Sequence, residues 1–511
     1  MSRAGRRGPR VRNLAAEQPA PRQPRLIREP LRVVSDDELE NIHRASLRVL
    51  AEIGIDFLLP EARRRLADVG ATVTGDSARV RFDPELIETL ISTAPSEFTL
   101  HGGAPARDLH IGGDWITFGC VASAPNIAER ATGRRAGDRK GFQDLTKLAH
   151  VLNPVHCFPG GYPVEPIDVH PSIRHLEAAW DGLTLSDKPN HVYSLGGQRN
   201  RDVIEMVRIA RGVSDVELDD QPSLMSVINA SSPLRYDLPM LEGIIEMAAR
   251  NQVLIITPFT LAGAMAPITI PGAIVQQNAE ALAGIAFVQV VNPGSPVMYG
   301  GFTSNVDMRS GSPAFGTPEY AKAALLGGQL ARRYGLPYRS SGVSTSNAVD
   351  AQAGYETMWA LMGAVLGGAN MILHAAGWME GGLHASPEKM VVDADLLNMV
   401  STFLQPIDAS VEALDLAVEA IVEVGPAGHF FATQHTQDRY MSEFYSPLVS
   451  DWRNWETWTE AGQPDAWERA ERIAQMFIAG HVEPPMPEHR RARLRDFVDR
   501  RIAEGGVPTD Y

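Results

Sequence analysis

The chain has 511 residues, 44% hydrophobic and 21% charged, an ordinary globular composition that builds a core without disulfides or metals. Its net charge of −15 argues against nucleic acid as a partner. The two cysteines, Cys120 and Cys157, form no CxxC pair, and so few thiols predict a reducing, cytoplasmic location. We expect no membrane span, because no uninterrupted apolar stretch approaches about 18 residues.

Residues 1–30 contain eight arginines and five prolines against two glutamates, Glu17 and Glu29. Such a segment has no apolar stretch for a signal peptide, and we predict a disordered basic tail. An electrostatic arm for an acidic partner is the alternative interpretation.

Residues 31–112 are predicted to form an α+β appendage. Ser35 is a candidate N-cap and Glu38 completes a capping-box pattern, so a helix is expected over 35–56. Further helices are expected at 60–69 and 84–93, with a short strand near 78–82.

Short apolar runs that end in small or polar residues recur from residue 115 onward. They are WITFGC (115–120), VHCFPG (155–160), HVYSLGG (191–197), SLMSVIN (223–229), VLIITP (253–258), PVMYGG (296–301), YRSSG (338–342) and MILHAA (371–376). Helix-like segments fill most of the intervals, which predicts parallel strands joined by helical crossovers. Eight such units favour an α/β fold with a (β/α)8 TIM barrel over 113–408, although periodicity alone leaves a doubly wound sheet open.

Residues 409–511 are predicted to be a C-terminal helical extension. It contains the tryptophan-dense DWRNWETW (451–458) and a highly charged last helix near 488–504. The tryptophan-rich tract is more typical of a docking or core surface than of a ligand cage, and together with the charged helix it favours a homo-oligomer.

Reactive groups of such a barrel lie at the carboxyl ends of its strands. His374 ends the eighth run, and a packed histidine and a functional one both fit that position. Metal binding needs three or four ligands, and His374 and His384 have only Glu380 between them as a carboxylate, so no bound metal is expected. No phosphate-loop or dinucleotide motif is present, and no bound nucleotide is expected.

Several long blocks of the sequence resemble the trimethylamine methyltransferase (MttB) superfamily. They are TLAGAMAPITIPGAIVQQNAEALAGI (260–285), GFTSNVDMRSGSPAFGTPEY (301–320), DAQAGYE (350–356), GANMILHAAGWMEGGL (368–383) and GPAGHFFATQHT (425–436). The resemblance covers about residues 35–480. It implies a barrel enzyme that moves a methyl group from a methylated amine to the Co(I) corrinoid (cobalamin) of a separate carrier protein docked at the barrel mouth.

The loop at 340–350 is where archaeal members of this family carry pyrrolysine, and here it contains only standard residues. The resemblance therefore points to the non-pyrrolysine branch, whose members resemble demethylases of glycine betaine and other quaternary amines. A quaternary nitrogen already carries the charge that makes it a good leaving group. The catalytic candidates are His374, Ser344, Ser346 and Asn347.

The predicted substrate-binding residues are aromatic rings for the cation, donors for a carboxylate, and polar groups near strand ends. They are Phe158, Asn229, Phe259, Tyr299, Phe302, Arg309, Arg339, Tyr355 and Glu356. Arg309 and Arg339 are equally good candidates for a betaine carboxylate.

Three other functions stay open at this point. One is a non-catalytic barrel that binds betaine-like ligands for regulation, and another is use of trimethylamine itself. The third is a barrel lyase or hydrolase with Glu356 as its base.

Overall fold

The computed structural model describes residues 18–509, and its centre is a curled sheet of seven strands that all pair in parallel. In spatial order the strands are β6 (Thr117–Cys120), β18 (Met371–Ala376), β17 (Tyr338–Ser341), β14 (Val297–Gly300), β12 (Val253–Ile256), β10 (Leu224–Ile228) and β9 (Asn190–His191). The α/β class predicted from the sequence is confirmed.

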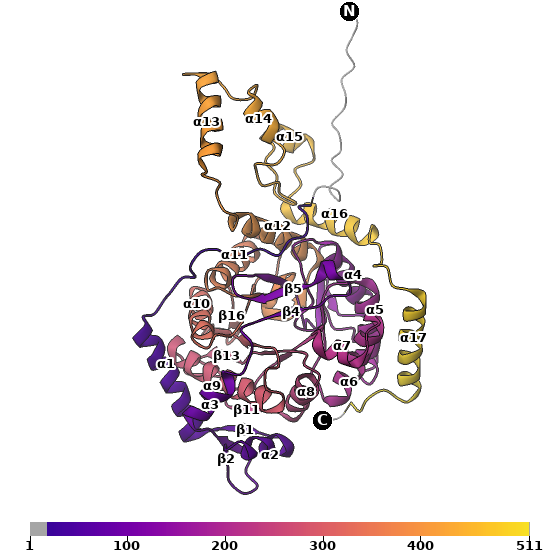
Figure 1. The fold of residues 1–511 in the computed structure, drawn as a ribbon. Helices are drawn as coiled ribbons and strands as arrows, with labels where there is room; N and C mark the ends of the chain where they lie inside the picture. The colour runs from indigo at the N-terminus through magenta and orange to yellow at the C-terminus, as the bar shows by residue number, and fades with distance from the viewer. Residues whose placement is uncertain (1–17, 510–511) are drawn as a thin grey trace, which may run out of the picture.

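Helices between successive strands form the layer around this sheet (Figure 1). They are α4 (Arg139–Val151), α5 (Arg174–Leu185), α6 (Gly197–Arg211), α7 (Asp215–Asp220), α8 (Leu238–Ala249), α9 (Ile270–Val291), α10 (Pro318–Arg333), α11 (Ala351–Leu366) and α12 (Pro387–Phe403). Helix α9 is long and apolar enough to cross a bilayer, but most of it is buried between the sheet and the N-terminal helices.

Six of the eight apolar runs contain one of these strands in full, the run at 191–197 shares only His191 with β9, and the run at 155–160 contributes less. It forms one isolated parallel bridge, between Gly119 and Cys157. His156 N donates to Phe118 O at 2.7 Å, and Phe158 N donates to Pro189 O at 3.0 Å. The run therefore lies between the two edge strands of the sheet, which the structure otherwise leaves as an open seven-stranded curl.

Alternation along the strands separates an inner face from an outer face. Met225, Val253 and Met298 share one apolar cluster with Leu109 and Ile111, whereas their neighbours pack outward with the helices. Leu109 and Ile111 belong to β5 (Leu109–Gly112). This strand pairs with β4 (Glu97–Leu100) in a hairpin that lies across the centre of the view in Figure 1. This hairpin covers the amino ends of the strands, so the carboxyl ends face the other side of the molecule.

The N-terminal part packs on α9. The expected helix at 35–56 is α1 (Asp36–Arg48), continued by one π-helical turn, and its Ser35–Glu38 capping box is confirmed. The remaining elements are β1 (Ile55–Phe57), α2 (Pro60–Asp68), β2 (Thr72–Val73), β3 (Arg79–Arg81) and α3 (Pro84–Ile91). Strands β1, β2 and β3 form a four-stranded sheet with β11 (Arg235–Tyr236).

The predicted disordered tail is described only in part. Residues 18–30 contact the segment that follows β5, where Leu26 N donates to Asp114 O at 2.8 Å and Arg25 pairs with Asp114. Arg25 also lies over the ring of Trp115. This stretch is ordered by those contacts, and residues 1–17 of the same prediction lie outside the described residues.

The C-terminal extension has one part on the helices around the sheet and one part away from them. Helix α16 (Ala466–Ala479) packs on α12 and α4, and α17 (Glu488–Ala503) packs on α5 and α6. Helices α13 (Val411–Val424), α14 (Gln434–Arg439) and α15 (Trp455–Glu460) stand away from the seven-stranded sheet and its helices at the top of Figure 1.

Candidate functional site

Three phenylalanines gather beyond the carboxyl ends of β12 and β14. Phe259 begins β13 (Phe259–Ala262) and Phe302 begins β15 (Phe302–Val306), which pair in parallel. Phe315 follows β16 (Pro313–Ala314) and stacks on Phe302 at 5.4 Å between ring centroids. Phe259 lies 5.1 Å from Phe302. Stacked rings of this kind present π-electron faces, which attract cations.

His374 is turned toward these rings by an irregularity in β18. Between Ile372 and Ala376 the pairing with β6 shifts, and His374 has a φ of +56°. Only a few per cent of residues other than glycine adopt that region. The imidazole lies 5.7 Å from the Phe302 ring and 4.0 Å from the Trp378 ring. The bulge therefore points a strand-end histidine into the aromatic cluster.

The imidazole of His374 is held in place and kept neutral. Its Nδ1 lies 3.1 Å from the hydroxyl oxygen of Ser341, at the end of β17. Burial, and then the positive charge of Arg339, hold the pKa of His374 well below its ordinary value. A neutral imidazole at this position adds an aromatic face without adding a competing charge.

Arg339 is the other polar group at this site, and it is 1% exposed. Its guanidinium lies 5.1 Å above the Phe302 ring, and Nη1 is 3.5 Å from the carbonyl oxygen of Gly301. Its Nε has no hydrogen-bond partner among residues 18–509. Burial lowers the pKa of Arg339 to about 10, which leaves it protonated at neutral pH. A buried charge without a full set of partners is expensive and suggests a site for an anion.

The loop after β17 is organised around Glu356 of α11. The Glu356 carboxylate accepts hydrogen bonds from Ser344 Oγ at 2.8 Å, Thr345 N at 2.7 Å and Gln352 Nε2 at 2.8 Å. Ser346 Oγ donates to Ala348 O at 2.9 Å. Ser344, Ser346 and Glu356 thus hold the loop together. The carboxylate oxygens of Glu356 are occupied by these hydrogen bonds.

Asn347 is an exposed residue of the same loop. It lines an open pocket with Glu380, His384 and Trp467, among others. His384 Nδ1 lies 2.9 Å from the Glu380 carboxylate. This pocket lies between the loop, α16, and the sheet that joins β19 (Trp378–Met379) and β20 (His384–Ala385) with β7 (Asn126–Glu129) and β8 (Gly133–Ala136).

Gly160 and Gly161 form a wall next to His374. A Cβ on Gly160 would lie 3.1 Å from Leu373 Cδ2 and 3.7 Å from His374 Nε2. Gly161 has a φ of +145°, and a Cβ there would clash with the Ser123 and Tyr193 hydroxyls. A side chain at position 160 would fill the space beside His374.

Tyr193 connects that wall to a buried carboxyl group. Its hydroxyl donates to Glu165 Oε1 at 2.9 Å and also contacts Ser123 Oγ. Burial raises the pKa of Glu165 above its ordinary value, and the Tyr193 hydrogen bond opposes that shift. Arg174 Nη1 is 3.8 Å from the same carboxyl.

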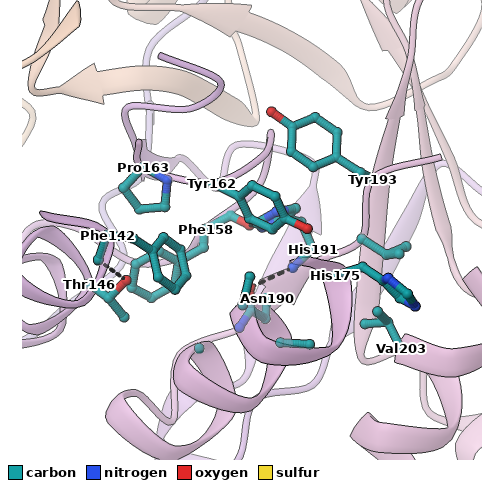
Figure 2. Close-up of a pocket in the computed structure, with 14 residues that line it drawn as sticks. Phe142, Thr146, Phe158, Tyr162, Pro163, His175, Asn190, His191, Tyr193 and Val203 are labelled. Atoms are coloured by element: carbon teal, nitrogen blue, oxygen red, sulfur yellow. Dashed lines mark hydrogen bonds between the residues drawn. The ribbon is translucent and has the colours of Figure 1, made fainter. Parts of the chain in front are cut away.

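Phe158 lies behind this wall, outside the sheet. It lines a narrow cavity between β9 and helices α4 to α6 (Figure 2). In Figure 2, Tyr162 and His191 lie between Phe142 of α4 and Tyr193. Tyr162 contacts Phe142 edge-on at 5.7 Å. The cavity belongs to the layer between sheet and helices, and Phe158 is separated there from Phe302 and His374.

The remaining predicted residues are exposed or make their contacts elsewhere. Tyr299 faces outward, where its hydroxyl donates to Asn278 Oδ1 of α9 at 3.0 Å. Asn229 is exposed just beyond β10, and Arg309 is exposed in the loop between β15 and β16. Tyr355 is 63% exposed on α11. Of the predicted binding residues, the structure brings Phe259, Phe302 and Arg339 together with His374.

The whole chain matches one protein family. The model of trimethylamine methyltransferase (MTTB) matches residues 3–506. The chain belongs to this family. It is 36% identical over 475 residues to a glycine betaine methyltransferase of Desulfitobacterium hafniense, covering 93% of this chain and 98% of the relative.

Two further relatives act, by their names, on different methylated amines. A trimethylamine methyltransferase MttB of D. hafniense is 30% identical over 477 residues, covering 93% of this chain and 94% of the relative. A proline betaine:corrinoid methyltransferase of Eubacterium limosum is 27% identical over 482 residues, covering 91% and 96%.

The fold is similar to that of a methyltransferase that is named for a different substrate, monomethylamine. The crystal structure of the monomethylamine methyltransferase MtmB of Methanosarcina barkeri superposes with a TM-score of 0.52. It covers 88% of both chains at 13% identity. A structure of MtmB with hydroxylamine gives the same TM-score at 14% identity.

Two aromatic residues of this trimethylamine methyltransferase family member were not predicted from its sequence. Phe315 directly follows the short strand β16, and Trp378 begins β19. Phe315 lies far beyond the end of any of the eight apolar runs, whereas Trp378 is the second residue after the last run and was within reach of strand-end reasoning. Among residues 18–509 no group of three or more metal-ligating side chains is present.

Proposed function

We propose that this methyltransferase takes a methyl group from a quaternary betaine and transfers it to the Co(I) corrinoid of a separate carrier protein. The observation that carries this choice of donor is the buried guanidinium of Arg339, which lacks an anionic partner in the described chain. A betaine supplies both a carboxylate for that guanidinium and a quaternary ammonium for the neighbouring rings.

Arg339 is the proposed anchor of the substrate carboxylate. A guanidinium presents two parallel N–H donors to a carboxylate, and such charge-assisted pairs are about twice as strong as neutral hydrogen bonds. Arg309, the other candidate from the sequence, is exposed and far less suited to exclude water.

The quaternary ammonium is proposed to lie among Phe259, Phe302, Phe315 and Trp378. Each aromatic face contributes on the order of 0.5–2 kcal/mol to binding a cation. The neutral state of His374 matters here, because a protonated imidazole 5.7 Å from Phe302 would repel the ammonium. His374 is therefore proposed to position the methyl group and to keep water away from it.

The reaction that these groups support is an in-line displacement at carbon. The electron pair of Co(I) forms the new bond to the methyl carbon, while the C–N pair stays on nitrogen and a neutral tertiary amine leaves. No side chain has to supply or remove a proton. The protein aligns donor and acceptor, and such alignment lowers a barrier by about 7–11 kcal/mol at best.

The loop after β17 favours a quaternary amine over trimethylamine. Residues 340–350 include no unusual nucleophile, and Ser344 and Ser346 are engaged in hydrogen bonds within the loop. A tertiary amine needs activation before it leaves carbon, and a quaternary one does not. The alternatives are trimethylamine as the substrate and a non-catalytic betaine-binding role. Glu356 is a poor candidate for the base of a lyase or hydrolase, because its carboxylate is hydrogen-bonded within the loop.

We further propose that residues 155–158 are the eighth strand of a (β/α)8 barrel over 113–408. The bridge between Gly119 and Cys157 and the hydrogen bond from Phe158 to Pro189 support this count. Residues 1–30, 31–112 and 409–511 are the tail, appendage and extension. The carrier would dock at the carboxyl ends of the strands, and the chain would act in the cytoplasm as a homo-oligomer.

The test uses the purified full chain, a reduced corrinoid carrier, and a panel of methylated amines. Glycine betaine should convert the Co(I) spectrum to that of methyl-Co(III), and dimethylglycine should appear in equal amount. Conversion with trimethylamine alone would overturn the choice of donor. Calorimetric binding of betaine without any conversion would instead establish a binding protein.

A further inference from the structure

Residues 407–455, here called the arm, expose far more apolar surface than the rest of the chain. Fourteen of the thirty-one large apolar side chains that are exposed in residues 18–509 lie in these forty-nine residues. They are Ile407, Val411, Leu414, Leu416, Val418, Ile421, Val422, Phe430, Phe431, Tyr440, Met441, Phe444, Trp452 and Trp455. Exposed patches of this size mark interaction surfaces.

The arm is firmly attached at its base. Asp395 of α12 accepts backbone hydrogen bonds from Leu448 at 2.8 Å, Val449 at 3.1 Å and Ser450 at 3.2 Å. Arg469 of α16 donates to Val449 O at 2.8 Å. Helices α12 and α16 therefore hold the arm at residues 448–450, and Figure 1 shows α13 extending away from them.

Helix α13 carries a stripe of the type that pairs helices. Val411, Leu414, Val418 and Ile421 follow one another at spacings of three, four and three residues, which is the a/d pattern of a coiled coil. These four, the seam, are 53–70% exposed. In a globular protein such a stripe faces the core, but Ala420 is the one buried residue of this helix.

We propose that the seam and the apolar surface around it bind the same arm of a second copy of this chain. Aromatic side chains bury on the order of 150–250 Å² each, so the six exposed aromatic rings of the arm offer together on the order of 600–1,000 Å². A standard interface buries about 800 Å² per partner, and obligate homodimers bury more. The aromatic rings alone thus reach the area of a standard interface, before the seam is added.

A second copy fits the arm better than the corrinoid carrier does. A carrier must dissociate in every catalytic cycle, and apolar surface of this extent would then be exposed to water each time. Two copies of one chain are always present together and cover each other permanently, in the self-complementary geometry of a two-fold dimer.

The charges on α13 allow this pairing. Glu412, Asp415, Glu419 and Glu423 make the helix acidic, without a basic residue. In heptad terms the seam occupies positions a and d, and Ala417 and Val424 occupy g. In parallel pairing, where position e faces g of the partner helix, Asp415 would therefore face an apolar residue and no acidic pair is forced together.

The first experiment measures the mass of the purified full chain by light scattering at micromolar concentration. The expected mass is a multiple of the 55.6 kDa chain, a dimer or an assembly of dimers. A double variant of the seam, Val418→Glu with Ile421→Glu, should halve that mass. Leu416→Glu is the matched control, because Leu416 lies on α13 at position f, away from the seam.

A second measurement covers the case in which a glutamate variant fails to fold. Both native cysteines are fully buried, so Val418→Cys introduces the accessible thiol. A short bis-maleimide should link two such chains in high yield, whereas Val216→Cys on the exposed helix α7 should give little product.

A monomeric wild-type chain would overturn the proposal, and so would a mass that rises only when the carrier is added. Loss of the dimer in Leu416→Glu but not in the double variant would also overturn it.

Discussion

The sharpest prediction concerns Arg339→Met, which removes the charge and keeps an unbranched side chain of similar length. Deleting one partner of a buried, hydrogen-bonded charge pair costs about 2–5 kcal/mol. At about 1.4 kcal/mol per tenfold, kcat/KM for glycine betaine should therefore fall by a factor of roughly 30 to several thousand. Rates are followed as methylation of the reduced corrinoid carrier.

A donor without a carboxylate provides the internal comparison for this variant. Tetramethylammonium keeps the quaternary nitrogen but has no carboxylate for Arg339 to bind. Its kcat/KM should therefore change by less than about tenfold, and that change comes from the lost contact between Arg339 and the Phe302 ring. Arg309→Met is the matched control, because Arg309 is exposed and its replacement should leave both donors unaffected.

The same substitution has a predicted effect on stability. Because the Arg339 Nε lacks a partner and the charge is buried, replacing it by an apolar side chain should leave the free energy of unfolding unchanged or raise it. Equal losses of kcat/KM for betaine and tetramethylammonium would refute the reasoning, since they would show that Arg339 does not recognise the carboxylate.

Three further outcomes are expected. His374→Asn should lower kcat/KM for betaine at least about tenfold through loss of the ring, yet unfold no earlier, because asparagine tolerates the φ of +56° better than most residues; earlier thermal unfolding would contradict this. Glu356→Gln should lower the free energy of unfolding by about 1–3 kcal/mol, because the amide N–H group meets donors of Ser344 and Thr345; an unchanged urea midpoint would contradict it. Burial lowers the pKa of His156 and of His191 to about 4, so the unfolded chain takes up protons below about pH 6.5 and the folded chain does not. The free energy of unfolding should therefore fall between pH 7.5 and pH 5, by about 2 kcal/mol per histidine, with a shallower slope in His191→Asn.

Much of the fold is predictable from the sequence because parallel strands are buried on both faces. Each then appears as a continuous apolar run, and six such runs contain a whole strand of the sheet. The run at 155–160 shows the limit of that signal. Pro154 and Pro159 flank it, and proline has no N–H to donate, so its hydrogen bonding is reduced to one bridge and a few contacts.

Which strand-end residues share a site depends on the face that each one occupies. Cys157 and Met298 belong to the inner cluster, so Phe158 and Tyr299, their next neighbours, face outward. A strict count of alternation along each run would have separated these two from the site. It would also have kept Arg339, because Tyr338 donates outward to Ala324 O and its neighbour faces the opposite side.

His374 is the residue for which alternation gives the wrong answer. Met371 and Leu373 belong to the inner cluster, so a regular β18 would direct residue 374 outward, against the helices. The structure instead has four residues of β18 spanning two of β6, with a left-handed residue between them. A backbone conformation of this kind costs about 1–3 kcal/mol and persists where surrounding contacts hold it. Here Ser341 and Trp378 hold the imidazole, so the irregularity is kept at the residue that most directly contacts the proposed substrate.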